Sequence, residues 1–418
     1  MKTMNQLEKF TEECRNASTA FLAVTRKDRL PVTVVHHNDA DGVAAAAVLA
    51  RACEMTGTKY RLLPLEKIHE RIVEKIHEAA GIVLYADLGG QSSHLIGRHA
   101  GQVRQVVILD HHLPGGPVPG NVIHCNCEHY GISGDDDASG ASVCALFARE
   151  LLREAVPGNR KEEAWLAAMG VVGAVGDGQD RTGGLTGLNG RFLKEALRAG
   201  VLEPWEKGYR MPALQQMPLG EVVEVLTLLG SVGFYSGSAE KGVAFLLGRD
   251  AGDTLRLSGR FREQKATAFR DEAARIRRQG LAQSLHFEWV NVADRFAPMG
   301  VKAIGLFLDH LIEEAMVDPD KYIIGFQHLP REMPGIGTLD RALTKISARV
   351  PPALKTTIQD GRRPDFMTLI PEATARVAGV ADGCHRFAAA SLIERGQEEA
   401  FMVALEAALA VAGSSVTS

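Results

Sequence analysis

Acidic residues and histidines follow directly after short apolar segments at four places in the amino-terminal part of the chain: HHNDADG, IVLYAD, VVILDHH and GVVGAVGDGQD. Carboxylate and imidazole groups in this proportion suit a divalent cation such as manganese, with magnesium as an alternative. There are enough of them to hold two ions about 3.5–4 Å apart that share a bridging carboxylate, an arrangement that activates water against phosphate esters. The candidate ligands are His36 or His37, Asp39, Asp41, Asp87, Asp110, His111, His112 and Asp177.

A single aspartate after a strand has a simpler explanation, because it is more often the N-cap of the next helix than a metal ligand. That explanation would suffice for Asp87 or Asp177 taken alone. Four such positions, two of them beside histidines, are hard to explain as caps. The sequence therefore favours a metal centre.

The segments that carry these residues alternate in pattern. Short β-branched runs such as VTVV, IVLYAD and VRQVVILD are separated by amphipathic or Ala-rich stretches, which predicts an α/β fold with helices on both faces of a parallel sheet. In such a sheet, side chains just after the strands meet in one crevice. The last of the four, Asp177, ends a small-residue segment that could be a helix or a strand.

Three regions of the sequence differ in their pattern of predicted helices and strands. We expect a catalytic domain over residues 1–190, a helical connector over residues 191–285, and a smaller α/β domain over residues 286–418 that contains HFEWVNV, YIIGFQH, LTKISARV and a helical tail. The connector carries many arginines between residues 256 and 278, which are either a solvated helix face or local contacts for a polyanion.

The composition limits the function classes. The chain has 418 residues, 45% of them hydrophobic and 23% charged, which excludes disordered, collagen-like and coiled-coil proteins. Its net charge of −4 gives no global attraction to nucleic acid. We find no signal peptide or membrane-spanning stretch and only six scattered cysteines, so a cytoplasmic, reducing location is expected.

We also weigh a zinc site at HCNCEH and disfavour it, because no second cysteine pair follows.

The motifs HNDADG, Asp87, DHH at residues 110–112 and GDGQD resemble the four signatures of the DHH phosphoesterase superfamily, which includes RecJ-type nucleases. The resemblance implies that His37, Asp39 and Asp87 bind one metal ion, with His36 as the alternative to His37. It implies that a second ion is bound by Asp41, Asp87, His111 and Asp177. It further implies that His112 meets the scissile phosphate and that Asp110 orients the neighbouring histidine.

The carboxyl-terminal region shows two weaker likenesses to the substrate-binding domain of the same superfamily. KISARV resembles its K-x-S-x-R strand, and GVADGCHRFAAAS resembles its GGGH signature, in which we expect a glycine turn leading into a helix of small residues. Without the family, the first would be an exposed edge strand and the second a helix packed on a sheet. The implied substrate-binding residues are Lys345, Ser347, Arg349, Gly383 and His385, and Arg349 and His385 would also neutralise charge on the reacting phosphate.

Together these features predict a manganese-dependent exonuclease of single-stranded DNA or RNA, close to archaeal RecJ-like proteins. The alternatives are a phosphodiesterase or phosphatase for short oligonucleotides or small nucleotides, and a replisome scaffold related to RecJ. A replication or repair protein is a possible partner, and no membrane is expected. All the ligand positions that the resemblance implies are filled, which favours an enzyme.

Overall fold

The computed structural model describes residues 5–78, 81–181, 183–206, 208–381 and 383–416. It divides into two compact units, residues 1–259 and 260–418, and each is described by itself. The functional division at residues 190 and 285 stays a prediction. Among the described residues, no helix has both the length and the apolar character needed to span a bilayer.

The first unit is built on a five-stranded parallel sheet, as the alternating pattern predicts. Its three central strands are mostly apolar and buried, which is typical of a sheet covered on both faces. One strand, with the sequence YRLLPL, was not expected, because it is partly exposed and contains a proline. The strand order is β2 (Tyr60–Leu65), β1 (Val32–His37), β3 (Ile82–Ala86), β4 (Gln105–Asp110) and β5 (Ile123–Asn126).

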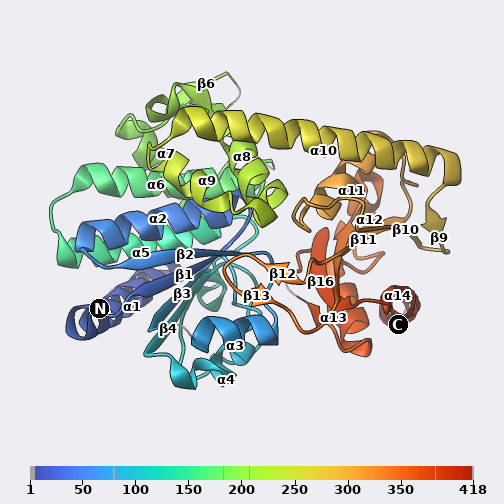
Figure 1. Ribbon diagram of the computed structural model, residues 1–418, viewed down its shortest axis with the longest axis horizontal. Coiled ribbons are helices and arrows are strands. Elements are labelled where there is room, and N and C mark those ends of the chain that lie inside the picture. Colours follow the sequence, from blue (N-terminus) through green and yellow to red (C-terminus); the bar gives the residue numbers. More distant parts are fainter. Residues whose placement is uncertain (1–4, 79–80, 182, 207, 382, 417–418) are drawn as a thin grey trace. The chain divides into compact units, whose positions relative to one another are not determined.

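Helices cover both faces of this sheet. Figure 1 shows α2 (Ala40–Thr56) and α5 (Gly140–Ala155) on one face, and α3 (Glu70–Glu78) and α4 (Ser93–Arg98) on the other. From β1 the chain adds β2 on one side, and it then adds β3, β4 and β5 on the other side. The crevice at the carboxyl ends of β1 and β3 is therefore a topological switch point, where ligands bind in open α/β sheets. The remaining elements of this part are α1 (Gln6–Asp28), η1 (Ala100–Gln102), η2 (Cys127–Tyr130) and α6 (Arg160–Gly176).

The rest of the first unit is mainly helical, as predicted, but it also contains a small three-stranded antiparallel sheet that the sequence did not indicate. A π-helical turn, η4, continues directly from α8. The elements are α7 (Gly187–Arg198), β6 (Glu203–Trp205), β7 (Gly208–Met211), η3 (Pro212–Leu214), β8 (Met217–Pro218), α8 (Leu219–Thr227), η4 (Leu228–Val232), η5 (Phe234–Ser236) and α9 (Ala239–Leu246).

The second unit has a mixed six-stranded sheet in the order β15-β16-β14-β11-β10-β9. Only β10 and β11 pair in parallel. The long helix α10 (Ala251–Gln279) starts in the first unit, and Phe269 on its second half packs against Phe296 and Phe307. The elements that follow are β9 (Ala282–Gln283), β10 (Phe287–Ala293), α11 (Ala303–Glu313), β11 (Tyr322–His328), β12 (Glu332–Met333), β13 (Gly337–Thr338), β14 (Leu343–Arg349), α12 (Pro352–Gln359), α13 (Phe366–Arg376), β15 (Val380–Ala381), β16 (Ala388–Glu394) and α14 (Glu398–Val416).

One prediction about this unit is wrong. The small residues after Gly383 form strand β16, not a helix. The strand lies between β14 and β15 and hydrogen-bonds to both. Pairing on both sides therefore outweighs the helix propensity of the Ala-rich sequence, as tertiary context often does. No helix N-terminus for an anion is formed there, and Asp382 of this segment lies outside the described residues.

Candidate metal centre

The carboxyl ends of β1, β3 and β4 bring together the side chains that the motifs singled out. His37 is the last residue of β1, Asp39 is the N-cap of α2, and Asp87 follows β3 directly. His111 follows β4, and Asp177 is the C-cap of α6, which settles the open choice between a helix and a strand before it.

The first set of groups consists of His37, Asp39 and Asp87. Nδ1 of His37 lies 2.9 Å from Oδ2 of Asp39 and 3.5 Å from Oδ2 of Asp87. Oδ1 of Asp39 accepts a hydrogen bond from the backbone N–H of Gly42 at 3.0 Å, so the residue caps α2 as well. All three residues are buried, and one potential ligand atom from each lies within 4.8 Å of the others. They can hold one cation.

The second set consists of Asp41, His111 and Asp177, again with one ligand atom each within 4.8 Å of the others. Nε2 of His111 lies 3.3 Å from Oδ2 of Asp177 and 3.8 Å from Oδ2 of Asp41. The same nitrogen lies 3.2 Å from Oδ1 of Asp87. The Asp87 carboxylate therefore directs one oxygen toward each set.

Asp87 has a demanding local geometry. Its φ of 60° lies in the left-handed region, which costs energy for a residue with a side chain and is common at functional sites. Gly140 at the start of α5 gives the carboxylate its room, because a Cβ there would lie 2.3 Å from Oδ1 of Asp87. The Asp87 carboxylate therefore requires a strained backbone at residue 87 and a residue without a side chain at position 140 of α5.

The amino terminus of α5 also holds Asp41. This fully buried carboxylate accepts hydrogen bonds from the backbone N–H groups of Gly140 at 2.7 Å and Ala141 at 2.8 Å. The helix dipole favours a negative charge at that position. Asp41 is therefore fixed by α5 while it faces His111.

The electrostatics of the two sets favour the binding of positive charge. Burial, followed by the charges of Asp41 and Asp39, raises the pKa of Asp87 well above its usual range, and burial also raises the pKa of Asp41. Partial removal from water and then the charge of Asp41 raise the pKa of Asp177 to about 7. Burial alone would lower the pKa of His111, but Asp87, Asp177 and Asp41 outweigh it and raise that pKa well above its usual range. Four carboxylates in one small volume fit divalent cations, which would neutralise them.

His111 is held by a buried hydrogen-bond chain that the sequence analysis missed. Its Nδ1 donates to the carbonyl of Gly134 at 2.6 Å, and Gln179 Nε2 donates to the same carbonyl at 2.8 Å. Gln179 Oε1 accepts from Asn189 Nδ2 at 2.5 Å, and Asn189 Oδ1 accepts from the hydroxyl of Ser142 at 2.6 Å. These hydrogen bonds fix which nitrogen of His111 faces the carboxylates. Only the nearness of Gln179 to Asp177 in sequence could have suggested it.

Asp110 serves the other histidine of the motif. Its Oδ1 lies 2.8 Å from Nδ1 of His112 and accepts from the backbone N–H of His111 at 2.8 Å, while its Oδ2 accepts from Gly90 N–H at 2.7 Å. Burial would raise the pKa of Asp110, but its histidine neighbours and this hydrogen bonding lower it. Asn126 Nδ2 donates to the carbonyl of His112 at 2.8 Å. Asp110 is thus placed to orient His112.

Two other sequence candidates lie outside the sets. Nδ1 of His36 lies 2.8 Å from the carbonyl oxygen of His37, and burial lowers the pKa of His36 to about 4. Neither His36 nor the residues of HCNCEH belong to any ligand set that the described residues form. The geometry favours His37 over His36.

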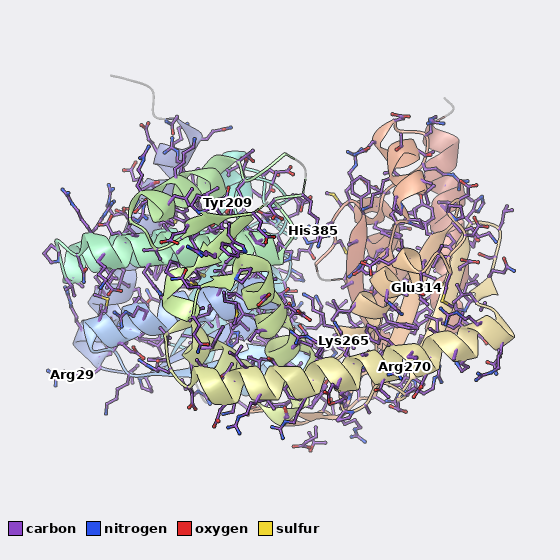
Figure 2. The ribbon with its side chains drawn as sticks, turned by 90° about the horizontal axis from the view of Figure 1, so that it is seen from above. Arg29, Tyr209, Lys265, Arg270, Glu314 and His385 are labelled. Carbon is purple, nitrogen blue, oxygen red and sulfur yellow. The ribbon has the colours of Figure 1, made fainter. Side chains whose placement is uncertain are left out.

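The proposed substrate residues lie in the second unit. Lys345, Ser347 and Arg349 alternate along β14, with Lys345 and Ser347 buried. Arg349 Nε donates to Asp309 Oδ1 at 2.9 Å. Gly383, with a φ of 73°, and His385 lie in the turn between β15 and β16 (Figure 2 labels His385), and Arg349 pairs with Ala388 just beyond that turn.

Comparison with known proteins agrees with this architecture. Residues 31–171 match the model of the DHH family, N-terminal domain. An uncharacterized protein from Methanocaldococcus jannaschii is 26% identical over 204 residues, which are 47% of this chain and 42% of that protein. The chain thus matches less than half the length of this curated relative.

Solved structures extend the likeness to both units. A crystal structure of exonuclease RecJ bound to manganese has a TM-score of 0.61 at 19% identity, covering 95% of this chain and 94% of that one. RecJ from Thermus thermophilus in complex with Mn²⁺ has a TM-score of 0.62 at 19% identity, covering 96% of this chain and 55% of that one. At these identities the likeness shows the fold. Residues 31–171 are therefore similar to the N-terminal domain of the DHH family, and the chain as a whole has the same fold as the RecJ structures.

Proposed function

We propose that this protein is a phosphodiesterase that uses two divalent cations, with manganese as the first choice and magnesium as the alternative, to remove nucleotides from an end of single-stranded DNA or RNA. One observation carries the proposal: the two oxygens of Asp87 face two different ligand sets, His37 with Asp39 and His111 with Asp41 and Asp177. The RecJ structures of similar fold hold manganese or magnesium.

The roles of the chain's own groups follow from their chemistry. Bound cations would supply activation of water and neutralisation of phosphate charge. Asp87 would be the shared ligand, and the remaining members of each set would complete the coordination. Asp110 holds Nδ1 of His112, so we assign His112 the role of contacting the scissile phosphate.

We assign substrate binding to the second unit. An ammonium, a hydroxyl and a guanidinium on alternate residues of β14 can bind phosphate oxygens, and these are Lys345, Ser347 and Arg349. Gly383 and His385 lie in the turn near Arg349. Arg349 and His385 would also neutralise charge that develops on the phosphate. The exposed Arg270 of α10, labelled in Figure 2 with Lys265, is a further candidate for contact with a polyanion.

The test is digestion of end-labelled single-stranded DNA and RNA with MnCl₂ or with EDTA, beside a dinucleotide. We expect manganese-dependent shortening of the long strands, and we expect Asp87→Asn to abolish it while circular dichroism stays unchanged. Asp320→Asn, at an exposed position outside both ligand sets, is the acid-to-amide control and should retain manganese-dependent shortening of the long strands. Full activity in EDTA or in the Asp87→Asn protein would contradict the proposal, and cleavage of the dinucleotide alone would point to small substrates.

A further inference from the structure

The backbone between two proposed ligands is held on both sides. Asn38 lies between His37 and Asp39 and is 1% exposed. Its side-chain N–H donates to Oε1 of Glu66 at 3.2 Å, and its carbonyl accepts a hydrogen bond from the hydroxyl of Ser231 at 3.1 Å. The residue has no place in the ligand sets, yet its position decides where its two neighbours lie.

Glu66 connects Asn38 to a distant part of the chain. It follows β2, is 2% exposed, and accepts a hydrogen bond from the hydroxyl of Tyr235 on its other oxygen, Oε2, at 2.7 Å. Burial and the charge of Glu66 keep the pKa of Tyr235 far above its usual value, so the phenol is the donor. Tyr235 belongs to η5, 169 residues beyond Glu66.

The π-helical turn η4 touches the same backbone directly. A Cβ on Gly230 would lie 2.2 Å from the carbonyl oxygen of Asn38 and 3.1 Å from its carbonyl carbon. The turn is buried over its whole length, and Ser231 is the next residue. π-Helical turns are rare and are frequently found at functional sites. Only a residue without a side chain permits this approach.

We propose that the segment 230–235, which we call the η4–η5 support, positions His37 and Asp39 for cation binding. Gly230 and Ser231 set the position of the Asn38 peptide from one side, and Tyr235 with Glu66 sets its side chain. These four are positioning residues, since they act through Asn38 and not on substrate. The inference rests on the proposed function, because it assigns a role toward the proposed ligands.

The physical basis is preorganisation. Groups that orient metal ligands contribute to metal affinity, and their loss typically costs about 10- to 100-fold in affinity or activity. A shift of a few tenths of an ångström at Asn38 moves His37 and Asp39 together, while His111 and Asp177 are carried by β4 and α6. Asp41 is held separately by the backbone N–H groups of Gly140 and Ala141. The support should therefore affect one of the two cation sites.

The experiment compares Gly230→Ala with Gly220→Ala, in which the added Cβ meets nothing within 4 Å. Manganese binding to the metal-stripped protein is followed by titration calorimetry and by electron paramagnetic resonance of the bound ion. We expect Gly230→Ala to weaken one of two binding events by about 10- to 100-fold and to lower kcat with little change in KM. Gly220→Ala should match the unaltered protein in both measurements.

Milder variants keep the test decisive if Gly230→Ala fails to fold. Ser231→Ala and Tyr235→Phe each remove one hydroxyl, and Glu66→Gln should be less damaging than Glu66→Ala because an amide oxygen can still accept from Tyr235. Two tight binding events that none of these folded variants changes would overturn the inference alone. A failure of the unaltered protein to bind manganese would overturn the proposed function and the inference with it.

Discussion

We predict that Gln179 keeps His111 in the orientation needed for cation binding. Replacement by alanine removes the Nε2 donor to the Gly134 carbonyl and the Oε1 acceptor of Asn189. His111 Nδ1 keeps its bond to Gly134, but the carbonyl is no longer held from the second direction. We expect a more mobile imidazole and weaker cation binding.

The magnitude follows from what the substitution leaves behind. Asn189 is fully buried, and its Nδ2 would lose the acceptor at 2.5 Å, which costs about 1–3 kcal/mol of unfolding free energy. The effect on metal affinity should be about 10- to 100-fold, equal to about 1.4–2.7 kcal/mol.

The assay pairs manganese calorimetry with urea unfolding of Gln179→Ala. Gln327→Ala is a matched control, because Gln327 is also a buried glutamine, 2% exposed, but lies on β11 of the second unit. We expect both variants to lose stability and only Gln179→Ala to lose affinity. If the two variants bound manganese equally well, the positioning of His111 by Gln179 would be refuted.

Further predictions concern the same centre and the second unit. Gly140→Ala, whose Cβ would lie 2.3 Å from Oδ1 of Asp87, should weaken manganese binding in calorimetry, whereas Gly101→Ala, with nothing within 4 Å, should not. Manganese at 100 times its Kd should stabilise the protein by about 2.7 kcal/mol per site, seen as a higher Tm that EDTA reverses. Glu272 is buried, and although burial would raise its pKa, Arg275 and Arg295 lower it. Glu272→Gln should therefore destabilise the fold in urea unfolding at pH 7 by about 1–3 kcal/mol. Since this contribution is present above the unfolded-state pKa of about 4.3 and is lost as the pH falls through the folded-state pKa, the difference should shrink in acid.

The sequence predicts the part of the fold that rests on local pattern. Apolar runs identify β1, β3 and β4, and the polar residues directly after them identify the crevice. The structure then brings these residues together as two sets joined at Asp87. Their roles as ligands stay a prediction until a cation is measured.

The missed features depend on contacts between distant residues. Strand β2 is partly exposed and contains Pro64, so its pattern is weak, although it pairs with β1 along its whole length. Strand β16 was expected to be a helix, because its alanines favour a helix locally. The pairing with β14 and β15 that makes it a strand has no signal in its own sequence. The partners of Gln179 and Glu66 are up to 169 residues away, and no local pattern reports them.

The left-handed backbone of Asp87 restricts which amino acids can stand there. Glycine, asparagine and aspartate tolerate that conformation best, and of these only aspartate supplies a carboxylate. A library of all substitutions at this codon should therefore give two different rankings: selection for cellular abundance would retain glycine and asparagine, whereas selection for turnover would discard both.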